Sequence, residues 1–256
     1  MRPNAGRAPL RGVPDGFAVL LSRLYVIADV EVLAGRGVSL EAFARELRAA
    51  GVGWLQWRDK VGSPQEVLRG AAVLREVFGE GITPRQTEKL PDMGHPILIM
   101  NDRADLAVLA GFDGVHVGQG DLAAEDARAV VGTGRIVGVS THTDEQVVAA
   151  APMSQNRDMG HPSAVDYIAI GPVFATGTKA NAETVVGLDG VRRARALTAK
   201  PLVAIGGITR ANARSVIDAG ADSVAVISGL FGVGESVEKV ARDFLEILGR
   251  PSKDQS

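Results

Sequence analysis

The chain has 256 residues, of which 46% are hydrophobic and 23% are charged, with a formal net charge of −2. It is long enough to bury a large core, and its near-neutral charge argues against a general binder of nucleic acids or membrane surfaces. The sequence contains no cysteine. This excludes disulfides, thiolate catalysis and cysteine-ligated zinc, and it fits a cytoplasmic protein.

The first twenty residues carry three arginines and no acid before Asp15, and Arg23 interrupts the apolar run that follows at 17–21. We expect residues 1–20 to form a flexible arm rather than a signal peptide. No run approaches the roughly 20 apolar residues that a membrane-spanning helix needs. Residues 250–256 are expected to be a flexible polar tail, which leaves 21–249 as the catalytic domain.

Short apolar runs alternate with amphipathic helical patterns along the whole chain. The expected strands are 24–28, 54–57, 97–100, 115–117, 136–139, 167–170, 202–205 and 223–227. The expected helices are 40–50, 64–78, 104–110, 123–131, 144–151, 188–198, 211–219 and 237–248. Candidate caps precede three of these helices, namely Ser39, Ser63 with Glu66 in a capping box, and Thr209.

Eight strand–helix units in a chain of this length predict an α/β fold, a single (β/α)₈ TIM barrel. A doubly wound sheet is the competing interpretation, but it seldom needs eight such regular repeats. Two polar insertions, 80–95 and 152–164, interrupt the pattern, and Asp-Met-Gly-His-Pro occurs at both, at 92–96 and at 158–162. Each precedes a strand, so we expect both on the amino-terminal face of the barrel, away from the chemistry.

Polar side chains follow the second, third and fourth expected strands. After the second comes Gln56-Trp57-Arg58-Asp59-Lys60, whose alternation places Gln56, Arg58 and Lys60 on one side. Asn101-Asp102 follows the third strand, and Asp121 follows the fourth. Two carboxylates on neighbouring strand ends either share a proton or hold a divalent cation, Mg²⁺ first. The alternative, that Asp102 only caps the next helix, stays open.

Hydroxyls and glycines follow the later strands. Ser140 lies after the fifth strand, and residues 171–179 after the sixth read Gly-Pro-Val-Phe-Ala-Thr-Gly-Thr-Lys. Gly206-Gly207 and Ile227-Ser228 follow the last two strands. Adjacent glycines free backbone N–H groups to meet an anion, and phosphate sites recur after strands 7 and 8 of such barrels. The sequence therefore predicts two anion sites.

Seven short motifs in chain order resemble the thiamine-phosphate synthase family from about Leu24 to Leu248. They are Gln-x-Arg-x-Lys at 56–60, Asn-Asp-Arg at 101–103, His-x-Gly-Gln-x-Asp at 116–121, Gly-x-Ser-x-His at 138–142, Gly-Pro-Val-Phe-x-Thr-x-Thr-Lys at 171–179, Gly-Gly-Ile at 206–208 and Ile-Ser at 227–228. The departures are the two insertions, Trp57 and Gly120, and none of them removes a functional group.

The resemblance implies condensation of 4-amino-2-methyl-5-(diphosphooxymethyl)pyrimidine with a (carboxy)thiazole phosphate. Thiamine monophosphate and diphosphate would be the products. The implied pyrimidine diphosphate residues are Gln56, Trp57, Arg58, Asp59, Lys60, Asn101, Ser140 and Lys179, of which Arg58, Lys60, Ser140 and Lys179 are catalytic. The implied thiazole phosphate residues are Thr176, Gly177, Thr178, Gly207, Ile227 and Ser228. Asp102 and Asp121 are the implied Mg²⁺ ligands.

Two alternatives remain open, a thiazole tautomerase-like barrel and a non-catalytic phosphate-binding barrel. The tautomerase relatives share the barrel and its phosphate loops, but they need neither the carboxylate pair nor the diphosphate cations. The expected partners are the two small-molecule substrates, with no nucleic acid and no membrane. The sequence is compatible with a homo-oligomer but does not fix the oligomeric state.

Overall fold

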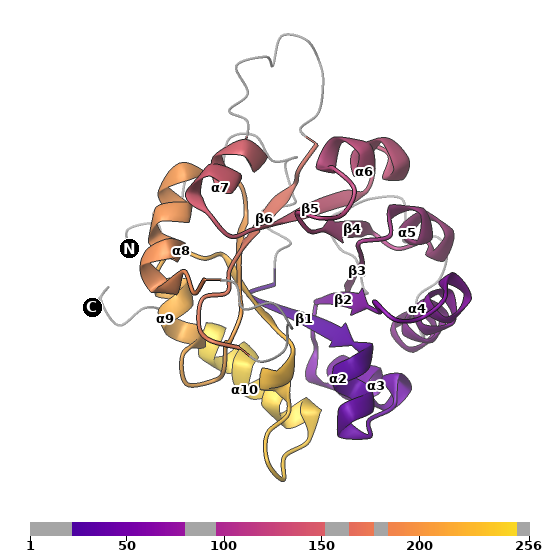
Figure 1. Cartoon of the computed structure of the whole chain (residues 1–256). Helices are drawn as coiled ribbons and strands as arrows, with labels where there is room; N and C mark the ends of the chain where they lie inside the picture. Colours follow the sequence, from indigo (N-terminus) through magenta and orange to yellow (C-terminus); the bar gives the residue numbers. More distant parts are fainter. Residues whose placement is uncertain (1–21, 80–95, 152–163, 177–183, 250–256) are drawn as a thin grey trace, which may run out of the picture.

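The structure, a computed structural model, describes residues 22–79, 96–151, 164–176 and 184–249. Eight parallel strands close into a barrel in the order of the chain, with β1 paired to β8 (Figure 1). The strands are β1 (Leu24–Asp29), β2 (Trp54–Arg58), β3 (Ile97–Asn101), β4 (Gly114–Val117), β5 (Ile136–Thr141), β6 (Tyr167–Ile170), β7 (Leu202–Ile205) and β8 (Ser223–Val226). The predicted TIM barrel is confirmed, and an open doubly wound sheet is excluded.

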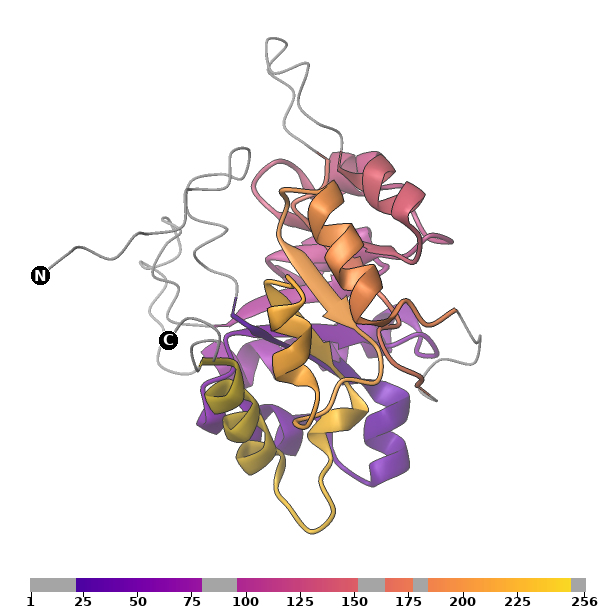
Figure 2. The same cartoon turned by 90° about the vertical axis from the view of Figure 1, so that its left-hand side faces the viewer.

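Helices surround the barrel, as Figures 1 and 2 show from two directions. They are α2 (Val30–Arg36), α3 (Leu40–Ala50), α4 (Pro64–Gly79), α5 (Ala104–Ala110), α6 (Ala124–Val131), α7 (Asp144–Ala150), α8 (Gly187–Leu197), α9 (Ala213–Asp218) and α10 (Val237–Gly249), with a short 3₁₀ helix η3 (Ser228–Leu230). α2 and η3 were not expected from the sequence. Among the described residues, no helix is long and apolar enough to cross a bilayer.

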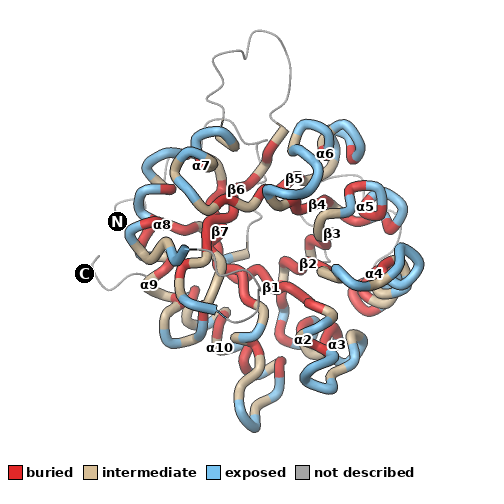
Figure 3. The backbone as a smooth tube through the Cα atoms, in the orientation of Figure 1, coloured by how far each residue is buried: buried red, intermediate tan, exposed pale blue. Residues whose placement is uncertain are grey.

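The core has two layers, because successive side chains of each strand point to opposite faces. The larger layer lies between strands and helices and includes Leu55, Met100 and Phe244. The smaller one fills the barrel interior. It consists of Tyr25, Ile27, Trp54, Ile97, Ile99, Tyr167, Ala169, Val203 and Ala225. The strands are accordingly buried almost throughout (Figure 3), as expected for a parallel sheet that is covered on both faces.

Two of the three predicted helix caps are confirmed. Ser39 accepts a hydrogen bond from the N–H of Ala42 at 3.2 Å, and Ser63 and Glu66 form the predicted capping box. The prediction for Thr209 is wrong. Its N–H donates to the side chain of Asn212, so the chain makes a turn there first and α9 begins only at Ala213.

The described ends of the chain meet at the amino-terminal end of the barrel. Arg23, just before β1, donates to the carbonyl of Leu248 in α10 at 2.8 Å. The hydroxyl of Ser223 donates to the carbonyl of Ser22 at 2.9 Å. The predicted arm, the polar tail and nearly all of the two insertions lie outside the described residues.

Candidate active site at the carboxyl ends of the strands

β2 carries polar side chains toward the mouth of the barrel, as its alternation predicts. Gln56 is 2% exposed and points into the interior, where its amide donates to the hydroxyl of Tyr25 at 2.7 Å. Arg58 forms an ion pair with Asp29 at the end of β1. Lys60 lies with its Nζ 2.9 Å from a carboxylate oxygen of Asp102. Two cations therefore lie at the end of β2, and each is paired with a carboxylate from a neighbouring strand end.

The side chains of Trp57 and Asp59 are not part of this group. The indole of Trp57 belongs to the strand–helix layer and donates to the carbonyl of Val67 in α4 at 3.1 Å. Asp59 accepts hydrogen bonds from the N–H groups of Val61 and Gly62, which shape the turn before α4. With these contacts, both side chains stabilise the end of β2 and the segment between β2 and α4, which carry the cations.

Asp29 was missed by the sequence interpretation because it ends an apolar strand without any flanking motif. Its carboxylate is only 2% exposed. One oxygen accepts from the N–H of Val32 at 3.0 Å and caps α2, while the other pairs with Arg58. A buried carboxylate requires such partners, because burial without them is strongly unfavourable. Asp29 thereby orients the guanidinium of Arg58.

Asp102 has an unusual backbone, with φ of 61°, the one positive value at a non-glycine among the described residues. Its N–H donates to the carbonyl of His116 in β4 at 2.7 Å. The residue that precedes α5 is Arg103, which makes no side-chain cap. The interpretation of Asp102 as a helix cap is therefore wrong. Left-handed backbone at a non-glycine residue is concentrated at functional sites.

Asp102 and Asp121 come together, as predicted for neighbouring strand ends. The pKa of the Asp102 carboxyl is raised, mainly by burial, and the hydrogen bond and negative charge of Asp121 raise it further while Lys60 opposes the shift. Asp121 also accepts from the N–H of Gly118 at 2.9 Å. The pair therefore concentrates negative charge beside Lys60, whose Nζ contacts Asp102.

Two carboxylates that come together are donors of the kind that Mg²⁺ takes from a protein. Mg²⁺ is usually held by one or two carboxylates together with waters and phosphate oxygens. Within the described part of the chain there is no group of three or more acidic, histidine or cysteine side chains that could hold a metal alone. The residues present therefore fit a shared ion and not a fully protein-ligated one.

Asn101 and Ser140 border the same mouth. The Nδ2 of Asn101 is buried and has no hydrogen-bond partner among the described residues. Buried polar groups are nearly always paired, so this amide is available to a ligand. The hydroxyl of Ser140 lies 2.9 Å from Nε2 of His116. His116 is the first residue of the motif at 116–121, but no contact of its side chain could be inferred from the sequence alone.

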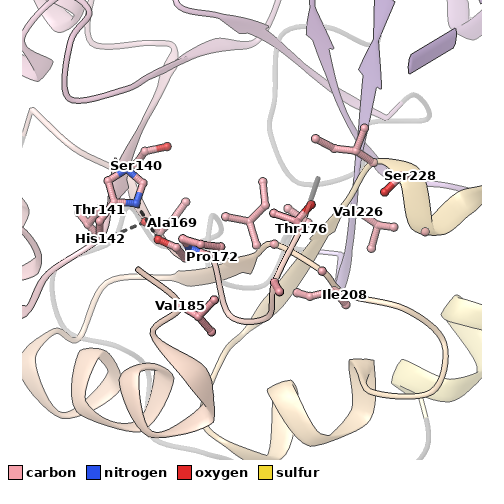
Figure 4. Close-up of a pocket in the computed structure, with 18 residues that line it drawn as sticks. Ser140, Thr141, His142, Ala169, Pro172, Thr176, Val185, Ile208, Val226 and Ser228 are labelled. Carbon is pink, nitrogen blue, oxygen red and sulfur yellow. Dashed lines mark hydrogen bonds between the residues drawn. The ribbon is translucent and has the colours of Figure 1, made fainter. Parts of the chain in front are cut away.

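A cavity of about 200 Å³ opens beside these groups, between the loops that follow β5, β6, β7 and β8. In Figure 4, Ser140 and His142 lie at one end of it, and Thr176 and Ser228 lie at the other. Gly207 and Ile227 also line it. Of the predicted thiazole phosphate residues, Gly177 and Thr178 lie outside the described residues, as does Lys179 of the pyrimidine diphosphate group.

Glycine is required in the loop after β7. Gly206 and Gly207 have φ of 103° and 64°, which favours glycine because side chains with a Cβ are strained there. A Cβ on Gly207 would also lie 2.7 Å from the carbonyl oxygen of Ala175. The loop after β6 therefore packs directly against the backbone of Gly207 at the edge of the cavity.

Comparisons with known proteins agree with this geometry. The family model described as thiamine monophosphate synthase matches residues 24–230. Thiamine-phosphate synthase of Koribacter versatilis (strain Ellin345) is 48% identical over 89% of this chain and 96% of its own, and that of Methanoculleus marisnigri (strain ATCC 35101 / DSM 1498 / JR1) is 39% identical over 83% and 89%. The solved structure of thiamine phosphate pyrophosphorylase from Pyrococcus furiosus superimposes with a TM-score of 0.69 at 28% identity, covering 89% of this chain and 96% of that one. The chain belongs to the thiamine monophosphate synthase family.

Proposed function

We propose that this transferase condenses 4-amino-2-methyl-5-(diphosphooxymethyl)pyrimidine with a thiazole phosphate, releasing thiamine monophosphate and diphosphate. The observation that carries the proposal is the pairing of two unlike sites at one mouth. One is the carboxylate pair Asp102 and Asp121 with its cations. The other is the glycine-bordered cavity of about 200 Å³. A tautomerase or a simple phosphate binder would use only the second.

The pyrimidine diphosphate occupies the mouth above β2 and β3. Arg58 and Lys60 face its phosphate oxygens, and the family resemblance assigns Lys179, which lies outside the described residues, to the same substrate. Asn101 and Ser140 face the pyrimidine ring, together with Gln56. The unpartnered amide of Asn101 supports this placement, because a bound polar ligand would satisfy it.

Asp102 and Asp121 are the proposed Mg²⁺ ligands. When bound, the ion would supply positive charge against the diphosphate oxygens, as metal ions do in phosphate chemistry. The raised pKa of Asp102 supports the assignment, since a cation would relieve the repulsion between the two carboxylates. Lys60 then exchanges a carboxylate partner for a phosphate oxygen as substrate enters.

The thiazole phosphate occupies the cavity. Gly207, Ile227 and Ser228 meet its phosphate with backbone N–H groups and a hydroxyl, and Thr176 lines the same cavity. The family resemblance adds Gly177 and Thr178, which lie outside the described residues, to this set. Backbone donors at such loops suit a phosphate dianion. The cavity joins the mouth at Ser140, so the thiazole nitrogen can face the pyrimidine methylene carbon.

The reaction then needs no protein nucleophile. The CH₂–O bond of the pyrimidine breaks, and the electron pair leaves with the diphosphate, whose growing charge faces Arg58 and Lys60. Lys179 is the third cation that the family resemblance assigns to this step. The amino group of the pyrimidine delocalises the cation that remains. The lone pair of the thiazole nitrogen attacks the methylene carbon, and the new C–N bond completes the product.

The test is thiamine phosphate formation from the two substrates by the purified chain, with and without Mg²⁺. Asp102→Ala and Asp121→Ala should each lower the coupling rate by roughly 100-fold or more, since each removes charge stabilisation of the leaving group. Asp105→Ala, an exposed carboxylate on α5, is the matched control and should keep the native rate. A near-native rate in excess EDTA would contradict the metal assignment.

A further inference from the structure

Five polar side chains form one continuous hydrogen-bonded chain across the barrel interior. Gln56 Nε2 donates to Tyr25 Oη at 2.7 Å, and Tyr25 Oη lies 3.0 Å from Tyr167 Oη. Tyr167 Oη lies 2.8 Å from Nδ1 of His116, and Nε2 of His116 lies 2.9 Å from Ser140 Oγ. The chain connects β2 to β5, three strands apart around the barrel. Its two ends are the proposed pyrimidine contacts Gln56 and Ser140.

The placement of the Gln56 amide nitrogen against the Tyr25 hydroxyl, together with burial, sets the direction in which the protons of this chain point. Tyr25 is 1% exposed, and its hydroxyl has two partners among the described residues, Gln56 and Tyr167. The amide N–H₂ of Gln56 can only donate. If Tyr167 also donated, the proton of Tyr25 would be buried without an acceptor, which native structures avoid. Tyr25 therefore donates to Tyr167.

The remaining protons follow in order. The hydroxyl proton of Tyr167 points to Nδ1 of His116, so Nδ1 accepts and the imidazole carries its proton on Nε2. Burial raises the pKa of both tyrosines, which keeps their hydroxyls protonated as this arrangement needs. Nε2–H donates to Ser140 Oγ. The proton of the Ser140 hydroxyl is left to point into the site.

The chain therefore fixes one acceptor and one donor at the mouth. Gln56 uses its Nε2 inside the barrel and offers Oε1, which has no partner among the described residues, as an acceptor. Ser140 offers its hydroxyl as a donor. An aminopyrimidine presents the complementary pair, an amino group that donates and a ring nitrogen that accepts. A 4-oxo-pyrimidine places a carbonyl, which can only accept, where the amino group stood.

We propose that Tyr25, Tyr167 and His116 are positioning residues that impose this donor–acceptor polarity and so select the aminopyrimidine over its 4-oxo counterpart. The inference rests on the proposed function, because it assumes that Gln56 and Ser140 meet the pyrimidine. None of the three touches the reacting atoms. They act by preventing the Gln56 amide from rotating and the His116 proton from moving to Nδ1.

The experiment compares kcat/KM for the amino and the 4-oxo pyrimidine diphosphates in Tyr25→Phe and Tyr167→Phe. Each variant removes one hydroxyl and keeps the ring, which packs against Trp54. Sites that hydrogen-bond their substrate reject unmatched analogues by about 10⁴-fold or more. We expect the ratio of kcat/KM for the amino substrate to kcat/KM for the 4-oxo substrate to fall by roughly 10- to 100-fold in both variants. KM for the thiazole phosphate should be unchanged.

Ser223→Ala is the matched control, because it removes a buried hydroxyl from β8 outside the chain. An equal loss of selectivity in Ser223→Ala, or an unchanged ratio in the folded tyrosine variants, overturns the inference. Wild-type protein inactive on the amino substrate would instead refute the proposed function. Nitrogen-15 NMR of the histidines provides a test without substitution of the tyrosines. The signal lost in His116→Gln should be that of a neutral Nε2–H imidazole, and an Nδ1–H signal refutes the chain's direction.

Discussion

At the scale of single residues, Asp29 combines two roles that one carboxylate can fill only because it is buried. One oxygen caps α2 and the other pairs with Arg58. The buried position keeps water from competing with either contact. The orientation of Arg58 at the mouth is thereby coupled to the start of α2, a helix that was not expected from the sequence.

Asp29→Asn and Asp29→Ala should separate these two roles. Asparagine remains a good helix cap, so Asp29→Asn should lose the ion pair but retain the cap. We expect about a tenfold lower kcat/KM for the pyrimidine diphosphate in both variants, because Arg58 loses its orientation. Asp29→Ala should lose about 1 kcal/mol more in free energy of unfolding, measured by denaturant titration. Equal stability of the two variants would contradict the capping role.

At the scale of elements, the loop after β7 shows why backbone rather than side chains borders the cavity. The N–H of Val173 donates to the carbonyl of Ile205 at 2.8 Å, and that of Phe174 donates to the carbonyl of Gly206 at 3.0 Å. These bonds hold the loops after β6 and β7 in direct contact. The contact leaves no room for a Cβ on Gly207.

Gly207→Ala should therefore damage one substrate site selectively. The left-handed φ costs alanine about 1–2 kcal/mol, and its Cβ pushes against Ala175 and Phe174. We expect KM for the thiazole phosphate to rise at least about tenfold, with KM for the pyrimidine diphosphate nearly unchanged, in steady-state kinetics. Gly35→Ala in α2, where a Cβ meets nothing, is the control and should keep both constants. Equal changes in both constants for Gly207→Ala would argue against a separate thiazole phosphate site.

At the scale of the whole molecule, an ion-pair network binds the last helix to the loop after β7. Arg210 pairs with Glu235 and Asp243, and Lys239 pairs with the same two carboxylates. Hydrogen bonds from Arg210, then from Lys239, lower the pKa of Glu235 to about 2. α10 is also held to α3, where the N–H of Glu238 donates to a carboxylate oxygen of Glu46 at 2.9 Å.

This shift predicts how the network responds to acid. A carboxylate whose pKa is lower in the folded chain stabilises the fold above its unfolded value, and this contribution is lost as pH falls. Glu235→Gln should thus be less stable than wild type at pH 7, and the gap should shrink between about pH 4.5 and pH 2. Urea unfolding across that range measures it. When Arg210→Met is present in both proteins, the difference in free energy of unfolding caused by Glu235→Gln should be smaller. A difference that does not change with pH would refute an ionic origin of the stabilisation.

The elements were largely predictable from the sequence, because each strand is a continuous apolar run bordered by polar residues. β2 shows this, with a predicted range of 54–57 and an observed range of Trp54–Arg58. α2 was not predictable in the same way. It is short and contains Gly35, and its cap, Asp29, looks like the end of a strand.

The site was predictable only where chain order alone brings residues together. Asp102 and Asp121 follow neighbouring strands, so their approach could be inferred. Tyr25 and Tyr167 lie in apolar runs and resemble core residues, and their strands, β1 and β6, are not neighbours in the sheet. Their contact depends on which side chains meet across the barrel interior. No local pattern encodes that.

The bond from Arg23 to the carbonyl of Leu248 has a practical consequence for anyone who engineers the chain. It holds Arg23 and Leu248, close to the two outer bounds of the described chain, together at the end of the barrel opposite the mouth. A tag, a reporter or a second enzyme fused directly at residue 22 or residue 249 would start from that opposite end and leave the approach of substrates open. The same proximity suits circular permutation of residues 22–249, in which a short linker joins these two residues and new ends are opened elsewhere.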